Sequence, residues 1–222
     1  MLYIVATPIG NREDITLRAL GVLREVDFVL AEDTRKTGTL LKHFNIKNKL
    51  ISFYDHNEDK KTARVLNELK KGKEIALVSS AGTPTISDPG FKLIRRCREE
   101  KVEVTSLPGA SSLITALSLS GISSDKFTFF GYLPRKKGAR RKLIAQIPNC
   151  PGSSVFFESP YRIVRTLEEL ERVLGDKKIT VCRELTKKFE EVVESSLKEA
   201  VEHFREKKPK GEFTLVLSSA SF

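Results

Sequence analysis

The stretch SSAGTPTISDPG, residues 79–90, decides the fold of this chain. It follows the apolar run EIALV and precedes the helical pattern FKLIRRC, and its twelve residues include two glycines and two prolines. A connection between a strand and a helix usually needs about two to six residues. In α/β proteins, long loops at the carboxyl ends of strands commonly hold a ligand. The stretch therefore predicts an α/β fold with a binding site at this end of the sheet.

Part of this loop has a local explanation. Asp88 followed by Pro89 is typical of the N-cap and first residue of a helix, so the segment SDPG predicts the start of the helix FKLIRRC. The segment SSAGTPT has no such explanation. Its alternatives are an ordinary surface loop or the wall of a ligand pocket, and we favour the pocket.

Apolar strands and helical patterns alternate on both sides of this loop. The first half contains five expected strands: residues 2–6, 27–32, 49–53, 74–79 and 102–107. Several are apolar throughout, which is typical of a parallel sheet covered by helices on both faces. We expect a domain boundary in LSGISSDKF, giving an N-terminal α/β domain over 1–120 and a C-terminal α/β domain over 121–222.

The second half has a different rhythm. Its expected strands are residues 127–132, 153–158, 178–184, 189–194 and 212–219. The short connection LTKK between two of them predicts an antiparallel hairpin, and so a mixed sheet. A long helix is indicated by the apolar stripe of Val164, Leu167, Leu170 and Leu174.

Two further loops resemble the first in composition. TPIGN, residues 7–11, and LPGASS, residues 107–112, also follow expected strands. Because the carboxyl ends of parallel strands share one edge of a sheet, we expect all three loops to converge there. The chain lacks both GxGxxG and GxxxxGK, which disfavours ordinary dinucleotide enzymes and phosphate-loop proteins.

Charged residues suggest two further features. AEDTR places Glu32, Asp33 and Arg35 after the second strand, where paired acids beside an arginine would position a substrate or act as a general base. The alternative is that Asp33 or Thr34 caps the next helix. RKKGARRK, residues 135–142, has six basic residues out of eight in a chain of net charge +10. It reads either as a solvated helix face or as a phosphate-binding segment for nucleic acid.

Other site classes find little support in the sequence. The three cysteines have no CxxC spacing and the three histidines do not cluster, so we expect neither a disulfide framework nor a metal site. No membrane span and no signal peptide are evident, which predicts a cytoplasmic protein.

Eight motifs, in order, resemble one known family. They are ATPIGNREDIT, AEDTR, SSAGTPTISDPG, SLPGASS, FFGYLPRKKG, FFESPYRI, RELTKKFEE and KGE. Together they resemble the 16S ribosomal RNA (cytidine 2′-O) methyltransferase family, in the tetrapyrrole methylase superfamily of class III S-adenosylmethionine-dependent enzymes.

The resemblance implies a fold, a cofactor and partners. It implies two α/β domains with S-adenosylmethionine in a cleft between them, a homodimer, and a substrate that is a cytidine ribose in the decoding region, either in free small-subunit RNA or in the assembled subunit. The residues it implies for cofactor binding are Pro8, Gly82, Thr83, Ile86, Ser111, Ser112, Leu185 and Gly211.

We assign the reaction and RNA contacts by location. Asp33 is expected to be the general base, with Arg35 holding a neighbouring phosphate. The expected RNA contacts are Arg135, Lys136, Lys137, Arg140 and Arg141.

The chain departs from the family pattern at two points. Ser80 stands where the family usually has an aspartate, and the small helical extension that often follows the last strand is not expected here. Two other functions stay open from the sequence. One is a methyltransferase of the same superfamily acting on a tetrapyrrole or other small molecule. The other is a basic RNA-binding or ribosome-assembly protein without catalysis.

Overall fold

The computed structural model describes residues 1–206 and 209–219. The chain divides into two compact units, Met1–Ser111 and Ser112–Phe222. The sequence placed the boundary after residue 120, whereas in the structure the helix α5 (Ser112–Leu119) groups with the second unit, where it contacts strand β10 (Phe213–Leu217).

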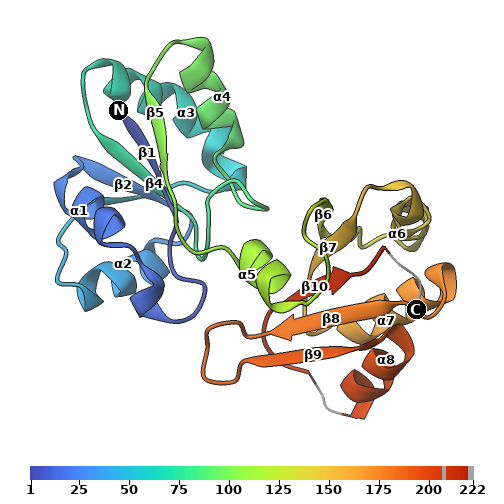
Figure 1. Cartoon of the computed structure of the whole chain (residues 1–222). Helices are drawn as coiled ribbons and strands as arrows, with labels where there is room; N and C mark the ends of the chain where they lie inside the picture. The colour runs from blue at the N-terminus through green and yellow to red at the C-terminus, as the bar shows by residue number, and fades with distance from the viewer. Residues whose placement is uncertain (207–208, 220–222) are drawn as a thin grey trace. The chain divides into compact units, whose positions relative to one another are not determined.

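The first unit is built on a fully parallel five-stranded sheet (Figure 1). From one edge to the other its strands are β3 (Leu50–Ser52), β2 (Phe28–Ala31), β4 (Ile75–Val78), β1 (Leu2–Val5) and β5 (Val104–Leu107). The two strands β1 and β4 therefore lie side by side near the middle, although some 70 residues separate them. The predicted parallel sheet is confirmed.

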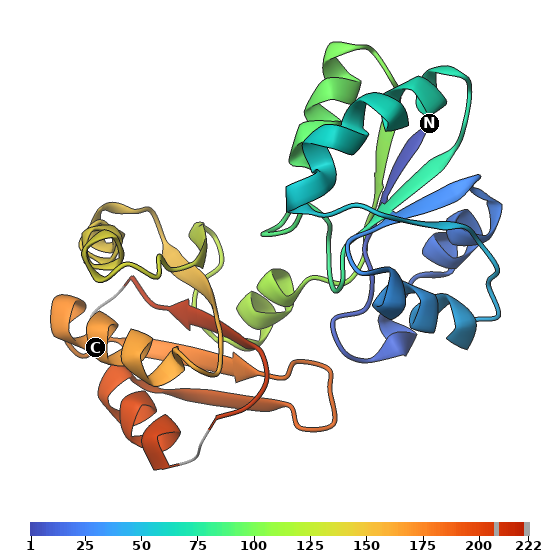
Figure 2. The ribbon, with the colours of Figure 1, turned by 180° about the vertical axis from the view of Figure 1, so that it is seen from behind.

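Helices cover both faces of this sheet, which explains why its strands are apolar throughout. Helices α1 (Leu17–Glu25) and α2 (Thr34–His43) share a core with the side chains of one face. Helices α3 (Asp55–Lys70) and α4 (Phe91–Glu99) share a second core with the opposite face (Figure 2). A short 3-10 helix, Arg12–Asp14, precedes α1.

The second unit holds a mixed five-stranded sheet. Its order is β6 (Phe127–Tyr132), β7 (Ser153–Glu158), β10, β8 (Lys178–Arg183) and β9 (Glu191–Ser196). Strands β6 and β7 are parallel and all other neighbours are antiparallel. The predicted mixed sheet and the β8–β9 hairpin are confirmed, although β9 begins two residues later than predicted, because residues 184–190 form the turn.

One apolar core stabilises the second unit. Helices α6 (Lys137–Ile144), α7 (Ile163–Leu174) and α8 (Leu197–Glu206), with a 3-10 turn at Ile147–Asn149, contribute to it. Phe156, Phe204 and Leu215 are almost completely buried there. Complete burial of a large apolar side chain stabilises the folded state by about 1.5–3 kcal/mol.

The cysteines are unpaired and differ in exposure. Cys97 and Cys182 are buried, and burial raises the pKa of each thiol to about 11, whereas Cys150 is half-buried. Within residues 1–206 and 209–219 no cluster of three or more acidic, histidine or cysteine side chains is arranged to hold a metal ion. The same residues contain no helix with the length and apolar character that a membrane span requires.

Candidate active site

Three loops meet at the carboxyl edge of the parallel sheet in the first unit. Thr7, after β1, exchanges two backbone hydrogen bonds with Gly82, after β4, at 2.8 and 2.9 Å. The Thr83 hydroxyl donates to the carbonyl of Ala110, in the loop after β5, at 3.1 Å. The predicted convergence of the loops is thus confirmed. It brings together five of the residues assigned to the cofactor: Pro8, Gly82, Thr83, Ile86 and Ser111.

Close packing between loops explains one of the glycines. A Cβ atom at Gly109 would lie 2.8 Å from the Cβ of Ala6, which is too short for two carbon atoms. Any larger residue at this position would separate the loops after β5 and β1. Gly109 therefore allows the loops after β1 and β5 to pack directly against each other.

The tip of the long loop is strained. Thr85 and Ser87 have φ values of +75° and +64°, a region that residues with a side chain rarely adopt. Between them the side chain of Ile86 stays 38% exposed. Strained residues of this kind persist where the surrounding structure enforces them, commonly at ligand sites.

The loop does not start helix α4 as predicted. The N-cap of α4 is Gly90, with φ of +123°, and not Asp88. The first free N–H groups of the helix, those of Lys92 and Leu93, donate at 3.0 and 3.2 Å to the carboxylate of Glu58, which is buried on α3. The prediction for Asp88 and Pro89 was wrong because a carboxylate distant in sequence satisfies these donors.

Asp88, which does not cap α4, has a carboxyl group in an unusual environment. Burial raises the pKa of its carboxyl group to about 7, and the nearby charges of Glu32 and Asp55 act in the same direction, whereas the neighbouring Ser79 hydroxyl lowers it. Glu32 in turn accepts the backbone N–H of Ser80 at 2.8 Å. At Ser80 the loop is thus held through its backbone by a carboxylate from the end of β2.

Asp33 has the opposite environment. Its carboxylate caps α2 by accepting the Arg35 backbone N–H at 2.9 Å, which confirms the predicted cap. It also accepts two hydrogen bonds from the Arg35 guanidinium, at 2.8 and 3.1 Å. These bonds hold the pKa of Asp33 well below its usual range, so the group is a weak proton acceptor.

Two more of the residues predicted to bind the cofactor, Leu185 and Gly211, lie in the second unit, both next to Glu184. Leu185 lies between Glu184 and Thr186, which both have positive φ, and Gly211 packs against Glu184 so closely that a Cβ would come within 2.4 Å of its Cγ. Glu184 and Glu212 also exchange backbone and side-chain hydrogen bonds, at 3.0 and 2.9 Å. Ser112, the last of the set, is the first residue of α5.

The basic segment 135–142 contains residues of two kinds. Arg135, Lys136, Lys137 and Arg141 are exposed. Arg140 is 2% exposed, and its guanidinium donates to both oxygens of the buried Glu169 at 2.5 and 2.7 Å. The assignment of Arg140 to RNA was wrong, because its charge is buried and fully paired.

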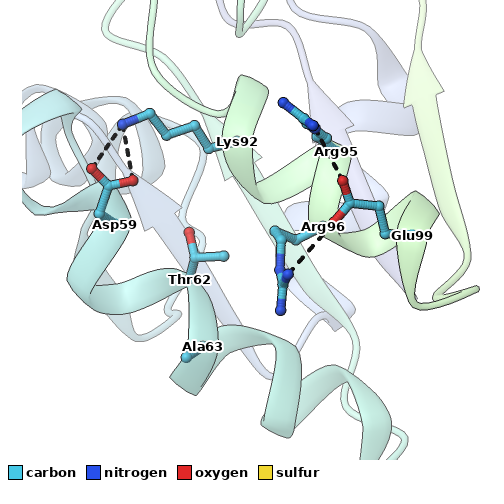
Figure 3. Close-up of a pocket in the computed structure, with 7 residues that line it drawn as sticks. All are labelled: Asp59, Thr62, Ala63, Lys92, Arg95, Arg96 and Glu99. Atoms are coloured by element: carbon cyan, nitrogen blue, oxygen red, sulfur yellow. Dashed lines mark hydrogen bonds and ion pairs between the residues drawn. The ribbon is translucent and has the colours of Figure 1, made fainter.

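A second basic cluster lies in a groove between α3 and α4 (Figure 3). Lys92 pairs with Asp59 at 2.7 Å, and Arg95 and Arg96 pair with Glu99 at 3.0 and 3.5 Å. Each cation therefore has an acidic partner. The groove lies on helices and not at the strand ends, and we do not regard it as the active site.

A family model described as tetrapyrrole (corrin/porphyrin) methylases matches residues 1–201. The chain belongs to the tetrapyrrole methylase family. Within this family it is 48% identical to the "Ribosomal RNA small subunit methyltransferase I" of Thermotoga maritima, over 98% of this chain and 97% of that protein. It is 47% identical to the protein of the same name from Haemophilus influenzae, over 98% of this chain and 78% of that protein.

Solved structures of tetrapyrrole methylases have the same fold. A cobalt precorrin-4 methyltransferase matches 98% of this chain and 94% of its own with a TM-score of 0.70, at 17% identity. A uroporphyrin-III C-methyltransferase from Thermus thermophilus, solved with S-adenosyl homocysteine, matches 97% of this chain and 96% of its own with a TM-score of 0.67, at 20% identity. At these identities the likeness concerns the fold alone.

The site residues were only partly recognisable from the sequence. The three loops were found by their glycine and proline content. Asp88 was not among the predicted site residues because its position before a proline indicated a helix cap, and Glu58 was missed because nothing in its sequence surroundings marks it as the partner of another helix's first N–H groups.

Proposed function

We propose that the chain is an S-adenosylmethionine-dependent methyltransferase that methylates the ribose 2′-oxygen of a cytidine in the decoding region of small-subunit ribosomal RNA. The observation that carries the proposal is the identity of 48% over nearly the whole chain with a relative named as a ribosomal RNA methyltransferase. The geometry of the first unit supports it, since three loops meet at the sheet edge where α/β enzymes hold their ligands.

The residues at this edge fit the proposed cofactor. Neutral hydroxyl and backbone groups at Thr83 and Ser111 suit a nucleoside, and the exposed Ile86 offers an apolar surface. The carboxylates of Glu32 and Asp88 would favour a cationic ligand over a phosphate-bearing one. Pro8, Gly82, Ser112, Leu185 and Gly211 complete the proposed set of contacts. When bound, the cofactor supplies a methyl group on a positively charged sulfur.

The chain's own task is then to orient the ribose and to accept a proton. The 2′-oxygen forms a bond to the methyl carbon as the bond from that carbon to sulfur breaks, and the hydroxyl proton passes to a base. We propose Asp88 for this role in place of Asp33, because a carboxyl group with a pKa of about 7 is a useful base at neutral pH. Asp33 is better suited to fixing Arg35, whose exposed guanidinium uses Nε and Nη2 on Asp33 and would offer its other N–H groups to a phosphate.

A direct assay tests the proposal. The protein is incubated with labelled cofactor and either small ribosomal subunits that lack the modification or the free RNA, and the methylated nucleotide is then mapped. We expect label on one cytidine ribose. Label on a base, or none on RNA while a tetrapyrrole is methylated, would overturn the substrate assignment.

Calorimetry separates this proposal from a non-catalytic RNA-binding protein. A methyltransferase binds S-adenosylmethionine without RNA, and a mere assembly factor does not. The homodimer implied by the resemblance and the cytoplasmic location predicted from the sequence are part of the same proposal. Sedimentation at twice the mass of the chain would support the dimer.

A further inference from the structure

Two exposed tyrosines lie at one edge of the mixed sheet. Strands β6 and β7 are parallel, and Tyr132 at the end of β6 pairs with Phe157 near the end of β7. Tyr132 is 54% exposed, and Tyr161, which follows β7, is 95% exposed. Because parallel strands end on the same side of a sheet, both residues lie at this end, and the hydrogen bond from Arg162 to the carbonyl of Leu133 joins their immediate neighbours.

The loop that follows β6, residues 133–135, is held by side chains from elsewhere in the second unit. Arg162, the neighbour of Tyr161, donates to the carbonyl of Leu133 at 2.6 Å. Arg140 donates to the carbonyls of Pro134 and Arg135 at 3.1 and 3.0 Å. Each guanidinium also pairs with a buried carboxylate, so neither arginine can leave without exposing that charge to an apolar core. The backbone of residues 133–135 is therefore fixed before any ligand arrives.

This fixed loop presents unpaired positive charge. Arg135, Lys136 and Lys137 are exposed, and no carboxylate of the described part of the chain forms an ion pair with them. The α4 groove differs, because each of its three cations has an acidic partner (Figure 3). Unpaired cations are the ones that can neutralise phosphates and release counterions.

The orientation of Tyr132 is also constrained. Its ring packs edge-on against that of Phe157, with 5.8 Å between the ring centroids. The ring of Phe157 packs in the same way against that of Phe129, with 4.9 Å between the centroids. A ring braced on one side by other aromatics, with more than half of its side chain exposed, can stack on a flat ligand without losing much conformational freedom.

We propose that Tyr132, Tyr161 and the loop cations Arg135, Lys136 and Lys137 form a binding surface for an unpaired RNA segment. The cations hold phosphates, and the tyrosines stack on bases that are not paired in a duplex. The inference rests on the proposed function for the identity of the polymer, and it adds that the substrate is recognised at single-stranded nucleotides.

A tryptophan reporter tests the stacking directly. The sequence contains no tryptophan, so Tyr161→Trp introduces a single indole fluorophore. We expect a single-stranded oligoribonucleotide to quench its emission, and a duplex of equal length to quench it at least tenfold more weakly. The matched control is Val173→Trp, which lies 39% exposed at the other end of α7, about 15 Å along the helix, and should not respond.

Methylation assays supply the second readout. Tyr161→Ala should raise KM for RNA about tenfold with little change in kcat, and Tyr161→Phe should behave like the original protein, because stacking needs the ring and not the hydroxyl group. Equal quenching by duplex, or an unchanged KM in Tyr161→Ala, would overturn the inference while methylation itself persists. Quenching by single strands without any methylation would instead overturn the proposed function and leave this surface standing.

Discussion

Asp33 and Asp88 carry the same functional group in opposite environments. Both lie close to the carboxyl ends of strands in the first unit. Two hydrogen bonds from a guanidinium favour the ionised form of Asp33, and its pKa is lowered. Burial and neighbouring carboxylates disfavour the ionised form of Asp88, and its pKa is raised to about 7. Of the two, only Asp88 changes its protonation state near neutral pH.

The substitution Asp88→Asn should lower kcat for methyl transfer by about 100-fold or more, because it removes the proton acceptor. In the original protein the active, ionised fraction of Asp88 rises with pH, from about a tenth at pH 6 to about a half at pH 7, so kcat should increase through neutral pH and level off above about pH 8. Rates measured from pH 5.5 to 9 check this. Asp33→Asn is the matched control and should leave the shape of the pH profile unchanged, whereas a profile flattened by Asp33→Asn alone would return the role to Asp33.

Arg140 shows why a count of charges misleads. Arg140→Ala would leave the buried Glu169 with the largely exposed Arg165, at 3.5 Å, as its remaining ion-pair partner, and we expect it to lower the free energy of unfolding by about 3 kcal/mol. Denaturant titration measures the loss. The double variant Arg140→Leu with Glu169→Leu should recover most of it, because no charge then lacks a partner. Full stability in the single variant would contradict the buried ion pair.

The helices α4 and α6 were both predicted as helical segments, but their contacts with distant residues were not. The alternation of strands and helices was readable because apolar periodicity is a local property. The start of α4 was not, since the carboxylate that accepts its first N–H groups belongs to Glu58 on α3, 33 residues before the first helical residue Phe91. Likewise the run 135–142 gave no sign that one of its cations faces the core, because burial depends on the partner Glu169.

Helix α6 begins with positive charge where helices prefer negative charge. Lys136 is its N-cap and Lys137 its first residue, so both lie at the positive end of the helix dipole. Replacing Arg135, Lys136 and Lys137 by glutamine should therefore leave the melting temperature unchanged or slightly raised. The same change should make RNA binding less dependent on salt, lowering the slope of log K against log salt by about 2.

The α4 groove provides a control with the same loss of charge. Replacing Lys92, Arg95 and Arg96 by glutamine also removes three positive charges, but these cations are already paired with acids. This triple variant should change the slope of log K against log salt clearly less than the triple variant of Arg135, Lys136 and Lys137 does. Equal slopes in the two triple variants would mean that net charge alone attracts RNA, and not the loop at β6.

At the scale of the whole molecule, each unit has its own sheet and its own core. The sequence predicted both α/β halves and the change from a parallel to a mixed sheet. It did not predict the strand orders, because pairing between β1 and β4 or between β7 and β10 depends on contacts between segments far apart in the chain. It also placed α5 in the first half, since an apolar helix carries no local sign of the sheet it will cover.

Each unit contains a buried cysteine, so the opening of the two units can be measured separately. Cys97 is enclosed in the first unit and Cys182 in the second, and both thiols resist deprotonation near neutral pH. Alkylation by iodoacetamide should therefore modify Cys150 within minutes, and reach the other two only when the surrounding unit opens. Peptide mass spectrometry over a time course would give a separate opening rate for each half. Repeating the time course with S-adenosylmethionine present would show in which half the methyl donor slows opening, without any engineered label.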